Sequence, residues 1–135
     1  MLTKLFHRVC IPVAVQEELL KFHDELPEWL EVIPVEDHTL VSAFAKKLDR
    51  GESEAIALAL QTNPDRLLID ERKGRLIASS QGIPIIGLVG LVILARRKGV
   101  IDSVTRILGD LETVAGFYLH PEVKRQALDA AGELN

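Results

Sequence analysis

Four carboxylates stand where the chain could hold a metal ion. Glu52 and Glu54 open a helical stretch, GESEAIALALQ, and Asp70 ends the apolar run LLID. Glu18 lies in an earlier helical stretch, beside an apolar stripe that includes Ala14. Mg²⁺ and Mn²⁺ prefer hard oxygen ligands, and such ions activate water and neutralise charge on a phosphodiester. These acids therefore indicate a candidate metal-dependent site. Like charges that converge there would raise at least one carboxyl pKa when no ion is bound.

The stretch from Gly51 to Gly90 supplies most of the elements that position these acids. We expect helices over Glu52 to Gln61 and Lys73 to Gln81, and strands over Arg66 to Asp70 and Ile83 to Ile86. Alternating helices and strands with short connections predict an α/β fold with a short, mainly parallel sheet. Ligands of such sheets bind outside the carboxyl ends of the strands, which is where Asp70 falls.

The flanking segments continue this pattern. On the N-terminal side we expect strands over Val9 to Ile11 and Trp29 to Val35, a helix from Val13 to about His23, and a helix capped by Asp37. On the C-terminal side we expect only helices, over Leu88 to Lys98, from Asp102 or Ser103, and from Pro121. With 135 residues and 47% apolar content, the chain is expected to form a single domain over residues 1–135.

Each acid also has a purely structural interpretation. Asp49 stands three residues before Glu52, which is the spacing of a helix cap, and acids in a first helical turn are favoured by the helix dipole. Asp70 could equally cap the helix that follows it. Glu52 and Glu54 lie about 200° apart around a regular helix, so both cannot face one ion. Glu18 has apolar helical neighbours and is a better candidate than Glu17 for an inward position, and the alternative is that both are solvated, since Glu is rarely buried.

Composition excludes several classes of protein. The single cysteine, Cys10, excludes a disulfide framework within the monomer, and with no visible signal peptide it favours a cytoplasmic location. The apolar stretch from Ile83 to Ala95 is too short and interrupted for a membrane helix, so no membrane partner is expected. A net charge of −4 gives no global basic field for nucleic acid.

Three basic residues follow Asp70, and their side chains could bind phosphates or form ion pairs with the acids. They are Arg72, Lys73 and Arg75.

Several stretches together carry a resemblance to a known family. They are VCIPVAVQEELL, GESEAIALALQ, LLIDERKGRLIASSQGIPIIGLVGLVILARRKGVID, GFYLHPEV and a terminal GE. The chain resembles, over almost all of its length, a family of PIN-domain-like proteins described as nucleic-acid-binding. The resemblance implies a three-layer α/β/α fold and Mg²⁺- or Mn²⁺-dependent endoribonuclease activity. It also implies, as for many relatives, a toxin role with an antitoxin protein as partner.

The resemblance also assigns site residues by position. It places the second family acid on Glu18, the third on Glu52 or Glu54, and the fourth on Asp70, with Glu71 able to support the fourth. The expected catalytic residues are thus Glu18, Glu52, Glu54 and Asp70, and the expected metal ligands are Glu18, Glu54 and Asp70. Arg72, Lys73 and Arg75 are the expected nucleic-acid-binding residues.

One family feature has no counterpart here. Relatives begin with a central strand that ends in Asp-Thr-Ser and supplies the first acid, whereas Met1 to Phe6 resembles the end of the helix after it. We therefore expect an N-terminally truncated PIN-like fold, weak or absent metal binding and little RNA cleavage. We also expect a homodimer that covers the strands beside the missing one. Two function classes stay open, a toxin-type ribonuclease and a non-catalytic PIN-like module that binds nucleic acid or protein.

Overall fold

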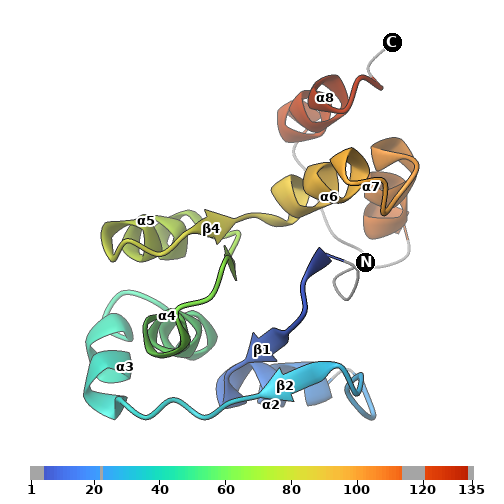
Figure 1. The fold of residues 1–135 in the computed structure, drawn as a ribbon. Coiled ribbons are helices and arrows are strands. Elements are labelled where there is room, and N and C mark those ends of the chain that lie inside the picture. Colours follow the sequence, from blue (N-terminus) through green and yellow to red (C-terminus); the bar gives the residue numbers. More distant parts are fainter. Residues whose placement is uncertain (1–4, 22, 114–120, 134–135) are drawn as a thin grey trace. The chain divides into compact units, whose positions relative to one another are not determined.

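Helices and short strands alternate along the N-terminal two thirds of the chain, and helices alone follow (Figure 1). The computed structural model describes residues 5–21, 23–113 and 121–133. The described chain divides into two units. We call Phe6–Ile86 the N-terminal unit, and the part that contains the last three helices the C-terminal unit.

The N-terminal unit contains two pairs of parallel strands. Strand β1 (Val9–Ile11) pairs with β2 (Leu30–Val32), and β3 (Leu67–Leu68) pairs with β4 (Ile85–Ile86). Within the described residues, these pairs form two separate two-stranded sheets. The parallel pairing and the alternating order confirm the α/β fold class that the sequence predicts.

The described helices of this unit are arranged around α4 (Arg50–Thr62). It contacts α2 (Val13–Leu20), α3 (His38–Phe44), α5 (Arg72–Ser80) and β3. Four consecutive residues of α4 are buried, Ile56, Ala57, Leu58 and Ala59. Since consecutive residues point to different sides of a helix, α4 is enclosed on most of its circumference.

The core of the N-terminal unit forms around α4. Phe44 and Leu48 from the α3 side, Ile69 from the end of β3 and Ala78 of α5 pack with its buried residues. Leu40 and Val41 pack against the same core, as the apolar spacing of the α3 segment predicts. The start of α4 is held in place by this packing, and with it the acids at its first turn.

The C-terminal unit contains α6 (Leu88–Arg97), α7 (Val104–Thr113) and α8 (Pro121–Ala130). Its core consists of Val92, Val104, Leu108 and Ala127, with one or two residues from each helix. Residues 2–4, within the predicted helix end, lie outside the described residues. Across the described ranges, every helix is too short or too polar to cross a membrane.

A single carboxylate, Glu133, closes the N-terminus of α7. Its oxygens accept hydrogen bonds from the backbone N–H groups of Val104 at 2.8 Å and Thr105 at 3.1 Å, and from the hydroxyls of Ser103 and Thr105, both at 2.8 Å. These donors hold the pKa of Glu133 at about 2, well below its usual value. The residue acts as a helix cap from outside the helix, because the first N–H groups of a helix have no partner within it.

Replacing Glu133 with alanine is expected to lower the unfolding temperature of the chain by roughly a few degrees, the scale of a lost helix cap. Because the pKa of Glu133 is depressed to about 2, its contribution is complete above about pH 4.5 and is lost as the pH falls towards 2. Thermal unfolding of wild type and variant should therefore converge at low pH. Asp129→Ala, an exposed change on α8, is the matched control. An equal unfolding temperature for Glu133→Ala and wild type at pH 7 would contradict the capping role.

Candidate acidic metal site

A hollow of about 330 Å³ lies beside the first turn of α4, and we call it the acidic pocket. Its carboxylates come from three places in the N-terminal unit: Glu18 from α2, Asp49 and Glu52 from the start of α4, and Asp70 and Glu71 after β3. The remaining lining residues are Val15, Gly51, Ala55, Leu68 and Ile69. Three of the four predicted site acids thus line one hollow, together with Asp49 and Glu71.

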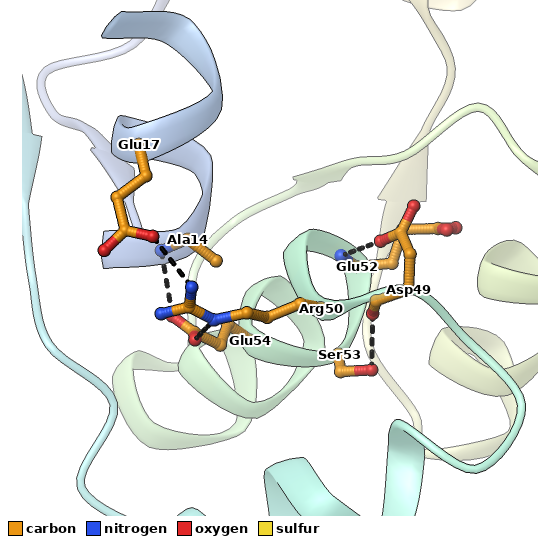
Figure 2. A network of polar contacts seen from close by, with 7 residues as sticks. All are labelled: Ala14, Glu17, Asp49, Arg50, Glu52, Ser53 and Glu54. Atoms are coloured by element: carbon orange, nitrogen blue, oxygen red, sulfur yellow. Dashed lines mark hydrogen bonds and ion pairs between the residues drawn. The ribbon is translucent and has the colours of Figure 1, made fainter. Parts of the chain in front are cut away.

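The first turn of α4 places two of these acids side by side. The Asp49 carboxylate accepts a hydrogen bond from the Glu52 N–H at 2.8 Å, and the Asp49 carbonyl oxygen accepts one from the Ser53 hydroxyl at 2.6 Å (Figure 2). Ser53 is fully buried and Asp49 is exposed, so this bond links the helix start to the interior of the unit. The predicted capping role of Asp49 is confirmed, and the cap also fixes Asp49 next to Glu52.

The closest set of carboxylates consists of Asp49, Glu52 and Glu71. Each offers one oxygen, and the three oxygens lie within 4.8 Å of one another. One oxygen of Glu52, Oε2, is buried and has no hydrogen-bond partner among the described residues. A buried acceptor without a partner is costly in free energy, so a cation at this point would relieve it.

A glycine on α5 leaves the room that the Glu52 carboxylate occupies. A Cβ atom at Gly74 would lie 2.6 Å from Glu52 Oε2 and 2.6 Å from Ile69 Cδ1. Both distances are shorter than a van der Waals contact, so any side chain at Gly74 would displace one of the two. The close approach of α5 to α4 at Gly74 therefore encloses Glu52.

The pKa of Glu52 is raised from 4.5 to about 7. Burial is the largest cause, and the neighbouring carboxyls of Asp49 and Glu71 add to it. The sequence predicts that converging like charges raise a carboxyl pKa, and for Glu52 the pKa is raised mainly by burial, with like charge as the smaller cause. The neighbours responsible are Asp49 and Glu71 rather than the predicted set.

The donor set of the acidic pocket fits a divalent cation. Its oxygens are hard ligands of the type that Mg²⁺ and Mn²⁺ select. A positive ion would compensate both the unpartnered Glu52 oxygen and the crowded negative charge. Asp49, Glu52 and Glu71 are the residues that would hold such an ion, and Glu18 and Asp70 line the same pocket.

Glu18 reaches the acidic pocket from α2 by lying against α4. A Cβ atom at Gly51 would lie 2.7 Å from Glu18 Oε1, so the glycine permits this contact. Glu18 is exposed, yet it lines the pocket, so the structure brings this predicted acid to the candidate site without burying it.

Glu54 points to the other side of α4 (Figure 2). Its Oε1 accepts a hydrogen bond from the Ala14 N–H at 3.0 Å, and its Oε2 accepts one from Arg50 Nε at 3.1 Å. Arg50 also donates to Glu17 at 2.7 Å, so Arg50 and Glu54 together fasten α2 to α4. As the angular separation requires, Glu52 lines the acidic pocket and Glu54 does not. A role for Glu54 as a metal ligand stays a prediction.

The predicted nucleic-acid-binding residues separate into two groups on α5. Arg72 and Arg75 line a second hollow together with Asp70, whereas Lys73 is exposed but does not line it. Asp70 borders both hollows.

Sequence reasoning underestimates Asp49 and Glu71. It predicts Asp49 only as a helix cap and Glu71 only as a supporting acid, whereas both belong to the closest set of carboxylates. A usable signal is that each of them flanks a predicted site acid, Asp49 across the first turn of α4 and Glu71 next to Asp70.

Comparison with known proteins gives one family. The chain matches the family DUF3368, described as a PIN domain, over residues 1–133. Comparisons with curated proteins and with solved structures gave no match. The match spans nearly the whole chain, covers all five acids of the pocket, and agrees with the α/β fold. This chain therefore belongs to the PIN-domain family, whose members are generally nucleases.

Proposed function

We propose that this protein is a divalent-metal-dependent nuclease that hydrolyses RNA phosphodiester bonds at the acidic pocket. The observation that supports it best is the buried Glu52 oxygen without a partner, beside two further carboxylates within 4.8 Å. In the proposal, Asp49, Glu52 and Glu71 hold Mg²⁺ or Mn²⁺. Membership of the PIN-domain family supports the same chemistry.

The residues of the pocket have separate tasks in this proposal. Asp49 positions Glu52 through the bond to its N–H, and Gly74 leaves the space for the Glu52 carboxylate. Glu52 must lose its proton to bind a cation, because a protonated carboxyl is a poor ligand. Glu18 and Asp70 border the cluster and can accept hydrogen bonds from water at the reacting phosphate. A bound ion would supply an activated water and neutralise charge on the phosphodiester.

An RNA cleavage assay tests this function. Wild-type protein with Mn²⁺ should cleave a labelled RNA slowly, in line with the weak activity that the sequence analysis expects, and chelation of the metal should stop the reaction. Glu52→Gln and Asp70→Asn should each reduce the rate by about a hundredfold, the upper range for disturbing a metal site. Glu28→Gln removes an exposed carboxylate in the same unit and should leave the rate unchanged. Cleavage that persists with both site variants would exclude the acidic pocket as the active site.

The engagement of Glu54 favours a second function, that of a non-catalytic module. Its carboxylate is held by Ala14 and Arg50, so a set of ligands that includes Glu54 is not assembled around one point. Under this alternative the chain binds RNA or protein without cleaving it. RNA binding by wild type, with no Mn²⁺-dependent cleavage, would favour the module over the nuclease.

The family resemblance supports a finer role, a cytoplasmic toxin whose activity an antitoxin protein restrains. Expression of the chain in a bacterial host provides the test. Growth arrest that Glu52→Gln relieves, at equal protein level, would support a toxin role. Arrest by both forms alike would assign the effect to something other than the acidic pocket.

We expect the protein to form a homodimer. Within the described residues, β1 and β3 each pair with one strand only, and Leu68 of β3 is 46% exposed. Unpaired strand edges are templates for a second chain. Light scattering on a size-exclusion column should give twice the mass of one chain at micromolar concentration. A well-folded monomer would contradict this expectation.

A further inference from the structure

The second hollow of the N-terminal unit has a volume of about 320 Å³ and adjoins the acidic pocket through Asp70. We call it the α5 groove, and its lining residues are Asp70, Arg72, Arg75, Leu76, Ser79 and Ile85. Its size is within the range of ligand-binding clefts.

The α5 groove combines positive charge with apolar surface along one helix face. Arg72, Arg75, Leu76 and Ser79 recur at the three- and four-residue spacing of a single face. Both arginines are exposed, and within the described residues their side chains make no hydrogen bond or ion pair. Leu76 is 62% exposed, the largest value among the exposed large hydrophobic side chains described.

The charge of the α5 groove is opposite to that of the pocket beside it. The acidic pocket repels phosphates unless a cation is bound, and the net charge of −4 gives no general attraction for a polyanion. A strand that is cut in the pocket therefore needs local positive charge nearby. Arg72 and Arg75 lie one helical turn apart and can bind neighbouring phosphate oxygens through their fork-shaped donors.

The apolar part of the α5 groove indicates which part of the ligand binds next to the phosphate. Leu76 and Ile85 offer aliphatic surface, which suits the face of an unpaired base. Ser79 offers a hydroxyl to the same ligand. A duplex presents mainly phosphates and grooves at its surface and keeps its base faces stacked inside.

We propose that the α5 groove is a binding subsite for one unpaired nucleotide of an RNA strand whose neighbouring phosphate enters the acidic pocket. Arg72 and Arg75 bind the phosphate of this nucleotide, and Leu76 and Ile85 contact its base. The proposal rests on the proposed nuclease function and adds to it a subsite outside the metal cluster.

Fluorescence anisotropy tests the subsite without metal or cleavage. The probes are a short labelled single-stranded RNA, the same RNA as a duplex, and a strand of equal length without bases, all in a chelating buffer. Arg72→Gln and Arg75→Gln should each weaken RNA binding by roughly two- to fivefold, the range of an exposed ion pair. Together they should lower the slope of log affinity against log salt by about 0.7 for each phosphate that the protein no longer neutralises.

Two variants separate charge from base contact. Lys46→Gln removes the same charge from an exposed position of the same unit, outside the α5 groove, and should leave the affinity and the salt slope near wild type. Leu76→Ala should weaken binding of the single strand by about threefold, because less apolar surface is buried against the base, and leave the baseless strand unaffected. Wild type should bind the single strand more tightly than the duplex.

Several results would overturn the subsite. They are an effect of Lys46→Gln equal to that of the arginine variants, no effect of Leu76→Ala, and equal binding of single strand and duplex. No RNA binding by wild type would also overturn it and would leave the α5 groove to a protein partner. If wild type binds Mn²⁺ in the acidic pocket but Arg72→Gln and Arg75→Gln bind RNA as wild type does, the subsite is contradicted and the nuclease function is not. RNA binding weakened in those variants as expected, with no Mn²⁺ binding by wild type, would contradict the nuclease function and leave the subsite standing.

Discussion

Replacing Glu52 with glutamine is expected to weaken Mn²⁺ binding by at least about tenfold. Glu52 supplies the buried oxygen that has no hydrogen-bond partner among the described residues, and it lies beside two other carboxylates. An amide keeps the shape of the side chain but removes the charge, so the weaker binding reports on ligation rather than on packing. Disturbing a metal site typically costs about 10–100-fold in affinity, the range expected here.

Titration calorimetry measures this change in Mn²⁺ affinity, and two other variants serve as comparisons. Glu28→Gln, an exposed carboxylate of the same unit, should bind as wild type does. Glu54→Gln separates the two candidate acids of α4, because Glu54 binds Ala14 and Arg50 and lies outside the acidic pocket. We expect Glu54→Gln to lower the unfolding temperature more than the Mn²⁺ affinity. The opposite order, with Glu54→Gln losing affinity and Glu52→Gln retaining it, would move the metal to the set that the family resemblance implies.

Mn²⁺ binding should also be strongly pH-dependent and release a proton. The pKa of Glu52 is about 7 in the metal-free protein, because burial and the carboxyls of Asp49 and Glu71 disfavour its charge. An incoming cation must displace that proton. The apparent affinity should therefore rise by about tenfold for each pH unit below about pH 6 and level off above about pH 8, as expected for competition with one proton. Calorimetry in buffers of different ionisation enthalpy should detect about one proton released at about pH 6.

The raised pKa of Glu52 also determines whether the stability of the metal-free protein rises or falls with pH. Between about pH 4.5 and about 7, folded Glu52 keeps a proton that the unfolded chain releases, so its contribution to stability falls as the pH rises through this window. Relative to Glu52→Gln, metal-free wild type should lose stability from about pH 4.5 to about 7, and saturating Mn²⁺ should remove that loss. A difference between wild type and variant that does not change across this window would show that Glu52 is not buried among other acids.

Much of the fold follows from local sequence patterns. Apolar spacing predicts the buried face of the α3 segment as Leu40, Val41, Phe44, Ala45 and Leu48, and all of these except the exposed Ala45 lie in or against the core. The cap residues Asp37 and Asp49 begin their helices as expected. The strands are shorter than their apolar runs suggest. Trp29 to Val35 yields only Leu30–Val32, because Pro34 cannot donate a ladder hydrogen bond. The division into two sheets depends on contacts between distant segments, which local patterns do not contain.

The site was less predictable than the fold, and α4 shows why. Its consecutive buried residues, from Ile56 to Ala59, leave no single apolar face from which to read which side meets the pocket. The choice between Glu52 and Glu54 therefore depends on the packing of α5 at Gly74 and of α2 at Ala14, which only the structure supplies. Glu71 joins the cluster because of how the chain turns after β3, which its position in the sequence does not fix.

The most direct test of the metal site is a crystal of the protein grown with Mn²⁺ and measured at the manganese absorption edge. Our account predicts one strong anomalous peak in the acidic pocket, in contact with oxygens of Asp49, Glu52 and Glu71. It also predicts that Glu54 remains bonded to the Ala14 N–H. A peak coordinated by Glu18, Glu54 and Asp70 instead, or no peak in the pocket at saturating Mn²⁺, would contradict it.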